Sequence, residues 1–315
     1  IELFCKPPET NRVFHTYQIR IQMKVFLFGQ NAKEENLPHL SGLVNQLREN
    51  KIEFLFFKNL YQQLPPDILS RVPSQTWESH QDILEHKPNS ILSLGGDGTI
   101  LQAVTYVRDS RVPILGINTG RLGFLASIEK KLIPDAVYHL IHGNYYTEER
   151  TLLQLESDSD LFGEIPIALN DFTISKRDNS SMITIHTYIN GDFMNSYWAD
   201  GLIVSSPTGS TGYSLSCGGP ILFPDTASFV ITPVAPHNLN VRPVVIPDHS
   251  ILSFEVEGRE DSFLCTLDSR KAVIHQNNQL AIRKCDYTIQ LIQLQPVSFL
   301  KTIHSKLNWG LDQRN

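Results

Sequence analysis

The feature that decides the fold is an apolar strand that runs directly into a glycine-rich loop, in residues 91–99, ILSLGGDGT. Three glycines surround a single aspartate, Asp97, and a helical stripe of apolar residues follows at once. Glycine lets backbone N–H groups turn toward a ligand, and a helix N-terminus adds partial positive charge. The loop therefore has the chemistry of a phosphate site, with a cap of the following helix as the alternative role for Asp97.

Two further loops follow apolar strands. Residues 118–124, NTGRLGF, come after the next strand of the series, and Arg121 is a candidate phosphate partner there. Phe124 either stacks on a base or packs in the core. The third segment is residues 200–220, DGLIVSSPTGSTGYSLSCGGP. It begins with a predicted strand and then carries seven Ser and Thr residues between positions 205 and 216. Hydroxyl groups suit ribose hydroxyls and phosphate oxygens, so we interpret this segment as a binding site.

Apolar runs alternate with helical stripes in the first half of the chain. Strands are expected at 24–29, 52–57, 91–94 and 112–117, and helices at 37–47, 100–107 and 132–141. This alternation predicts right-handed βαβ units on a mostly parallel sheet. After about residue 150, eight short β-rich runs dominate, and Asn190-Gly191 between two of them indicates a hairpin.

These patterns predict four segments. Residues 1–22 are expected to be an extension outside the fold, and 23–149 an α/β domain that carries the first glycine loop. Residues 150–297 are expected to form a β-rich layered domain, and 298–315 a tail that packs back on the first domain. The length of 315 residues suits two domains.

Composition and charge exclude several classes of protein. Hydrophobic residues make up 41% and charged residues 19% of the chain, as in globular proteins. A net charge of −6 disfavours a nucleic-acid partner, which needs a basic face. No apolar stretch is long enough to span a membrane. The four cysteines and the pair His139 and His142 match no metal pattern, and reduced thiols in the cytoplasm are expected.

Taken in order, these motifs resemble those of the NAD kinase family. The similarity rests on G-G-D-G-T at 95–99, T-G-x-L-G-F at 119–124, the pair Asn170-Asp171 and the long motif at 200–220, with H-N-L-x-x-R-P at 237–243. It covers nearly the whole chain from Met23. The family has a Rossmann-like α/β domain, a β-rich domain and an active site in the cleft between them. It transfers the γ-phosphoryl group of ATP to the 2′-hydroxyl of the adenosine ribose of NAD.

The resemblance implies roles for individual residues. Asp97 would be the general base. The phosphate and dinucleotide contacts would come from Gly95, Gly96, Gly98, Thr99, Arg121, Phe124, Asn170, Asp171, Asp200, Thr208, Thr211, Gly212, Tyr213 and Ser216. Mg²⁺ or another divalent metal would accompany ATP, with no dedicated metal ligand expected in the chain, and the family assembles as homodimers or homotetramers.

Three positions depart from the family pattern. Gly212 stands where alanine is common, Asp171 where glutamate is frequent, and Asp268-Ser269-Arg270 replaces the usual D-G-Q. The late loop is therefore the part of the site that the resemblance describes least well. A lipid kinase with the same G-G-D-G loop and a non-catalytic NAD-binding regulator are the alternative functions; a structural β-domain partner with incidental loops is a third. Sequence does not distinguish ATP from polyphosphate, NAD from NADH, or dimer from tetramer, nor does it show feedback regulation.

Overall fold

The structure is a computed structural model, and it describes residues 23–120, 123–126, 128–177, 181–294, 299–307 and 309. The chain divides into two compact units. Of the described residues, the first unit contains those at 23–100, at 112–148 and from 290 onward, and the second contains those at 101–111 and 149–289. The expected extension at 1–22 lies outside the described residues.

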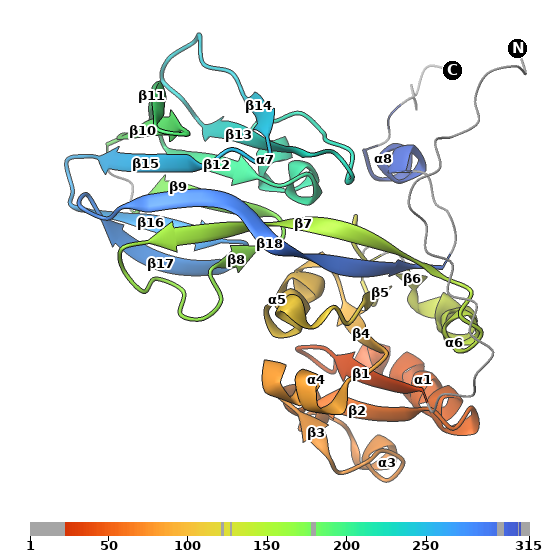
Figure 1. Cartoon of the computed structure of the whole chain (residues 1–315). Helices are drawn as coiled ribbons and strands as arrows, with labels where there is room; N and C mark the ends of the chain where they lie inside the picture. The colour runs from red at the N-terminus through yellow and green to blue at the C-terminus, as the bar shows by residue number, and fades with distance from the viewer. Residues whose placement is uncertain are drawn as a thin grey trace, which may run out of the picture. The chain divides into compact units, whose positions relative to one another are not determined.

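The first unit is built on a parallel sheet (Figure 1). Its strand order is β3-β2-β1-β4-β5, and every one of these neighbours pairs in parallel. The strands are β1 (Lys24–Phe28), β2 (Glu53–Phe57), β3 (Thr76–Trp77), β4 (Ser90–Gly95) and β5 (Ile114–Asn118). The short strand β6 (Ile128–Glu129) pairs with the end of β5. The predicted parallel α/β fold is confirmed.

Helices of the first unit form where apolar spacing and capping residues favour them. The apolar stripe of α1 is buried at Leu40, Leu43, Val44 and Leu47, and a proline stands in its first turn. Ser79 begins α4 with a capping box to Asp82. The helices are α1 (Leu37–Glu49), α2 (Lys58–Tyr61), α3 (Pro66–Leu69), α4 (His80–His86), α5 (Asp97–Val107), α6 (Ile133–Ile141) and α8 (Phe299–Leu307), and α5 continues into the second unit.

The second unit consists mainly of antiparallel strands. One sheet has the order β14-β13-β12-β9-β16-β17, and in the other β11, β10, β15 and β18 are neighbours. The elements are β7 (Tyr146–Ser157), β8 (Ile167–Ala168), β9 (Asp171–Lys176), β10 (Ile183–Ile189), β11 (Asp192–Ala199), β12 (Gly201–Ser205), α7 (Tyr213–Ser216), β13 (Ser228–Val234), β14 (Val244–Pro247), β15 (Leu252–Glu257), β16 (Ser262–Leu267), β17 (Arg270–His275) and β18 (Leu280–Gln293). β7 starts, and β18 ends, in the first unit.

A single apolar core joins the two sheets of the second unit. Phe172 of β9 lies 5.6 Å from Phe254 of β15 between ring centroids, so side chains of opposite sheets meet. The predicted hairpin is confirmed, because Asn190 and Gly191 have φ values of +52° and +89° between β10 and β11. Sequence patterns missed β7, β9, β14 and β17, and the run at 165–169 forms a strand only at Ile167–Ala168.

Candidate active site

In the first unit, the glycine loop between β4 and α5 leaves its backbone open. A Cβ at Gly96 or Gly98 would meet nothing within 4 Å, and Gly98 is exposed. Gly95 is different, because a Cβ there would overlap the side chain of Thr99 and would force the turn apart. The loop is therefore compact at its first glycine and accessible at the next two, as the approach of a phosphate group requires.

The Asp97 carboxylate binds the loop that follows β5. Its Oδ2 accepts the N–H of Phe124 at 2.7 Å, and its Oδ1 accepts those of Leu125 at 3.0 Å and Ala126 at 2.9 Å. Asp97 is the first residue of α5, yet these bonds reach across to a second loop. Asp97 is therefore not a simple helix cap. Its carboxylate joins the loop after β4 to the loop after β5, and we call these three hydrogen bonds the Asp97 clamp.

Gly123 makes this clamp possible. A Cβ at that position would overlap Cγ and both oxygens of the Asp97 carboxylate. Phe124 is half-buried, whereas Leu125 and Ala126 are buried, so Phe124 is not a core residue. The predicted phosphate partner Arg121 lies outside the described residues.

In the second unit, a second aspartate organises the predicted Asn170-Asp171 pair. The Asp268 carboxylate accepts the N–H groups of Leu169 at 3.0 Å, Asn170 at 2.7 Å and Asp171 at 3.3 Å. In return, the N–H of Asp268 donates to the carbonyl of Asp171 at 2.9 Å. Sequence analysis named Asp268 only as part of a loop that departs from the family pattern D-G-Q. Asp268 is the one residue of that loop that keeps the pattern, and this could have marked it as a structural residue of the site.

Arg270 completes this late loop. Its guanidinium donates to the carbonyl oxygens of Ile165 and Ile167 and lies over the ring of Phe162, 5.7 Å from the centroid. Arg270, which stands where the family usually has glutamine, therefore stabilises the backbone that leads to Asn170.

Asp171 lies in an unusual electrostatic environment. Burial, followed by the neighbouring charge of Asp268, raises the pKa of Asp171 to about 7. Its side chain is 8% exposed and accepts the hydroxyl of Thr173 at 3.3 Å. The carboxyl group is therefore poised to change protonation near neutral pH.

Most hydroxyls of the long Ser/Thr/Gly segment serve the fold. Ser206 Oγ donates to the carbonyl of Leu169, Ser210 Oγ to that of Pro207, and Ser214 Oγ bonds Thr232 Oγ1 at 2.8 Å. The hydroxyls of Ser206, Ser210 and Ser214 therefore bond within the protein, although the segment as a whole was expected to bind a ligand. They hold a 3₁₀ turn, Thr208–Thr211, against the backbone of Asn170, where a Cβ at Gly209 would collide.

Two polar atoms of this region are buried without a partner. Neither Asn170 Oδ1 nor Thr208 Oγ1 has a hydrogen bond within the described part of the chain. Buried polar atoms are almost always paired, because an unpaired one costs about 1–3 kcal/mol. Both belong to the predicted dinucleotide set.

The remaining predicted residues surround the same turn. Tyr213 is 48% exposed, and burial, Cys217, Asp171 and Asp200 all raise its pKa, so these groups lie near one another. Asp200 pairs with Lys176 at 2.8 Å, a cation that sequence reasoning did not name. Thr211 donates to the carbonyl of Thr208, and Ser216 is exposed at the end of α7. A Cβ at Gly212 would stand 3.1 Å from the Gly209 oxygen, which is tight.

The described residues contain no group of three or more His, Cys, Asp or Glu side chains that could hold a metal ion. None of the described helices has the length and apolar character needed to span a bilayer.

Two family models match most of the chain. Residues 19–145 match the ATP-NAD kinase N-terminal domain, and residues 169–294 match the ATP-NAD kinase C-terminal domain. An NAD kinase of Cytophaga hutchinsonii is 50% identical over 290 residues, covering 92% of this chain and 99% of that protein. An NAD kinase of Flavobacterium johnsoniae is 46% identical over 295 residues, 93% of this chain and 100% of that protein.

Solved structures share the fold. The yeast NADH kinase complexed with NADH has a TM-score of 0.83 at 21% identity, over 98% of this chain and 94% of that one. The NAD kinase from Archaeoglobus fulgidus in complex with ATP has a TM-score of 0.70 at 21% identity, over 91% of this chain and 98% of that one.

Proposed function

Because the chain belongs to the ATP-NAD kinase family and has the NAD kinase activity of that family, we propose that Asp97 is the base that takes the proton of the 2′-hydroxyl. Family membership makes the chain an ATP-dependent kinase acting on NAD, and it favours neither a lipid kinase nor a non-catalytic regulator.

One observation carries the role of Asp97. A carboxylate has about four lone-pair sites, and three of them accept the N–H groups of residues 124–126. The remaining site is on Oδ2, which accepts a single N–H. The backbone therefore fixes the carboxylate and leaves one acceptor direction for a hydroxyl, as general base catalysis requires.

The proposed reaction transfers the γ-phosphoryl group of ATP to the 2′-hydroxyl. The 2′-oxygen of the ribose bonds to the γ-phosphorus of ATP, and the bond from that phosphorus to the bridging oxygen breaks with its electrons leaving on ADP. The hydroxyl proton passes to Asp97 Oδ2 and then to water. Phosphoryl transfer has a loose transition state, so the protein contributes mainly positioning and charge neutralisation.

The open glycines of the first unit suit the phosphate groups of ATP. Gly96, Gly98 and the start of α5 present backbone N–H groups without a side chain in the way. Gly95 and Thr99 hold the turn that presents them. We assign Phe124, which is half-buried, to contact with the dinucleotide.

The second unit supplies the proposed dinucleotide contacts. Asn170 Oδ1 and Thr208 Oγ1 are the buried atoms that a ligand would pair, and Asp171, Asp200 and Tyr213 lie around them. Thr211, Gly212 and Ser216 continue the same turn. Ribose hydroxyls and an amide match this mixture of donors and acceptors.

A divalent metal would accompany ATP. Mg²⁺ in phosphoryl-transfer sites is held largely by substrate phosphates and by one or two carboxylates. When bound, the metal offsets charge on the triphosphate.

We also propose that the chain assembles as a homo-oligomer. Within the described residues β11 is an outermost strand, and it carries Phe193, 60% exposed, and Trp198, 43% exposed. Exposed apolar side chains on an edge strand suit pairing with a second copy. Light scattering should show a dimer or tetramer, and Phe193→Glu should shift it toward monomer. A monomeric wild-type chain would contradict this.

A cytoplasmic location is a further proposal. Cys217, Cys265 and Cys285 are free thiols, which suits a reducing compartment.

The decisive experiment is a coupled assay of the full chain. ATP, NAD and Mg²⁺ should yield NADP, read out by an NADP-specific dehydrogenase. A diacylglycerol control should give no product. NAD binding without phosphoryl transfer would instead support a regulator.

A further inference from the structure

Lys176, the last residue of β9, forms an ion pair with Asp200, which directly precedes β12. Lys176 Nζ lies 2.8 Å from Asp200 Oδ1, and both side chains are partly exposed. The main chain joins the same two residues without this pair, because the N–H of Lys176 donates to the carbonyl of Asp200 at 3.0 Å. Ion pairs near the surface add little to the free energy of unfolding. The pair therefore points to a role other than stability.

Gly201 fixes the backbone on which Asp200 stands. Strands β9 and β12 approach closely at this point, since a Cβ at Gly201 would lie 2.5 Å from the carbonyl oxygen of Ile174. On the other side, the N–H of Asp200 donates to the carbonyl of Val234 at 3.0 Å. Because the main chain of Asp200 is held from both sides, Lys176 controls the direction and the net charge of the side chain.

The predicted dinucleotide residues lie at both ends of β12, which has five residues and is about 16 Å long. At its carboxyl end, the N–H of Ser206 donates to the carbonyl of Asn170 at 2.9 Å, and the turn that starts at Thr208 follows. At its amino end stands Asp200 with Lys176. All of these residues belong to the second unit. Polar groups spaced in this way suit a dinucleotide, whose two nucleosides are joined by a pyrophosphate.

The two ends of β12 offer different chemistry. At the carboxyl end, Asn170 Oδ1 and Thr208 Oγ1 are uncharged atoms buried without a partner in the described part of the chain, and they suit the hydroxyl and amino groups of an adenosine. The Asp171 carboxylate at that end is buried and accepts the hydroxyl of Thr173. The accessible carboxylate is therefore that of Asp200, and a carboxylate suits the nicotinamide ring, which is a cation in NAD.

We propose that Lys176 is a positioning residue that sets, through Asp200, the preference of the enzyme between NAD and NADH. This inference rests on the proposed dinucleotide contacts of the second unit. The two dinucleotides differ in the nicotinamide ring, which is a cation in NAD and neutral in NADH. A lone carboxylate beside the ring favours the cation, whereas a carboxylate paired with an ammonium has little net charge and favours it much less. The wild type should therefore phosphorylate both dinucleotides.

The test measures kcat/KM for NAD and for NADH with ATP and Mg²⁺, and chromatography separates the products NADP and NADPH. Lys176→Met should raise the ratio of the two values, NAD over NADH, about fivefold. The change should appear chiefly in KM, because the charge acts on the bound substrate and on the transition state alike. Asp200→Asn should lower the same ratio, since it leaves the Lys176 ammonium beside the ring without its carboxylate. Damage to the fold alone would not move the ratio in opposite directions.

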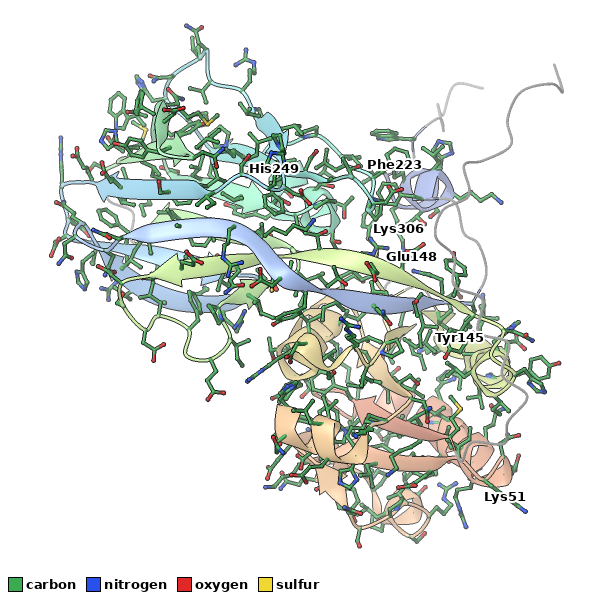
Figure 2. The ribbon with its side chains drawn as sticks, in the orientation of Figure 1. Lys51, Tyr145, Glu148, Phe223, His249 and Lys306 are labelled. Carbon is green, nitrogen blue, oxygen red and sulfur yellow. The ribbon has the colours of Figure 1, made fainter. Side chains whose placement is uncertain are left out.

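The matched control is a second lysine–aspartate pair of the same unit. Lys284 Nζ lies 2.6 Å from Asp248 Oδ2, and Asp248 is next to His249 (Figure 2). Asp248 follows β14, which pairs with the end of β13 opposite to Val234. Lys284→Met should lower the thermal midpoint, because it leaves the buried Asp248 carboxylate without its cation, and it should leave the NAD/NADH ratio unchanged.

Lys176→Arg keeps the charge and should therefore keep the ratio of the wild type. If Lys176→Met fails to fold, Lys176→Arg and Asp200→Asn still decide the matter, because only the second should change the ratio. An unchanged ratio in Lys176→Met or in Asp200→Asn, or a wild type that phosphorylates NAD but not NADH, would overturn this inference and leave the proposed function standing. A wild type that phosphorylates neither dinucleotide would overturn both.

Discussion

Asp97 in the first unit and Asp268 in the second bind the backbone in nearly the same way. Asp97 accepts three consecutive N–H groups at 2.7–3.0 Å, and Asp268 accepts three at 2.7–3.3 Å. Each uses one oxygen for a single N–H and the other for two. Hydrogen-bond geometry alone would give the two aspartates the same role.

Their surroundings differ. The Asp97 carboxylate lies against Gly123, which has no side chain, and close to the cation of Lys306. Asp268 lies in the tight turn between β16 and β17 with a φ of +53°, beside Asp171 and Arg270. Burial is the largest cause that raises the pKa of Asp268.

The comparison shows that the role of a carboxylate held by backbone N–H groups depends on its neighbours, a glycine and a lysine at Asp97 but a second carboxylate and an arginine at Asp268. We therefore expect changes at Asp97 to affect the reaction and changes at Asp268 to affect stability and ligand placement.

The largest effect is expected for Asp97→Asn. The amide cannot take the 2′-hydroxyl proton and, as at Asp268, cannot accept all three backbone N–H groups, so kcat should fall by about 10²–10⁴-fold. NAD binding, measured by titration calorimetry, should be retained. Wild-type turnover in this variant would exclude Asp97 as the base.

Gly123→Ala should give the next largest effect. The added Cβ overlaps the Asp97 carboxylate, which must move away from the N–H groups of residues 124–126. Displacement by about 1 Å reduces turnover by about 10²-fold. Gly120→Ala is the matched control, because its Cβ would meet only Asn118 Oδ1 at 4.0 Å. Equal kcat values for the two alanine variants would show that the clamp does not orient the base.

Asp268→Asn should act on stability. Asparagine tolerates the left-handed φ, but its single carbonyl oxygen cannot accept all three N–H groups. One unpaired donor costs about 1–3 kcal/mol, and each kcal/mol lowers the thermal midpoint by roughly 2–4 °C. Ser269→Ala, at an exposed position of the same turn, is the control in a melting experiment. A loss of kcat at unchanged midpoint would contradict the distinction between the two aspartates.

The smallest effect is a pH dependence at Asp171. Since its pKa is raised to about 7 in the folded chain, the native state holds this proton more tightly than the unfolded chain does. Its contribution to stability is complete below about pH 4 and is lost as the pH rises through about 7. Asp171→Asn mimics the protonated form, so its melting midpoint should exceed that of the wild type at pH 8 by a few degrees and should approach it at pH 5.

The exposed Asp192→Asn is the control for this measurement, because Asp192 lies at the start of β11. Parallel midpoint curves for wild type and Asp171→Asn between pH 5 and pH 8 would show that Asp171 does not titrate in that range.

Local sequence was enough to predict four strands and three helices of the first unit, but not β3, β6, α2, α3 or α4. Apolar periodicity located β1, β2, β4 and α1, because burial of one face is recorded at a fixed spacing. Apolar periodicity did not locate β7 or β9. In β7 buried and partly buried positions alternate irregularly, and in β9 polar residues interrupt the apolar run. The resemblance then supplied the family from motif order.

The sequence by itself determined the α/β and β-rich halves, the glycine loops and the family, because periodicity and glycine freedom are properties of neighbouring residues. Only the tertiary structure decided which groups meet. Asp97 bonds residues 27–29 positions away, and Asp268 bonds residues 97–99 positions away. Lys306 approaches Asp97 from the end of the chain. No local pattern records such pairs, since the free energy of each depends on burial and charge created only when distant segments pack together.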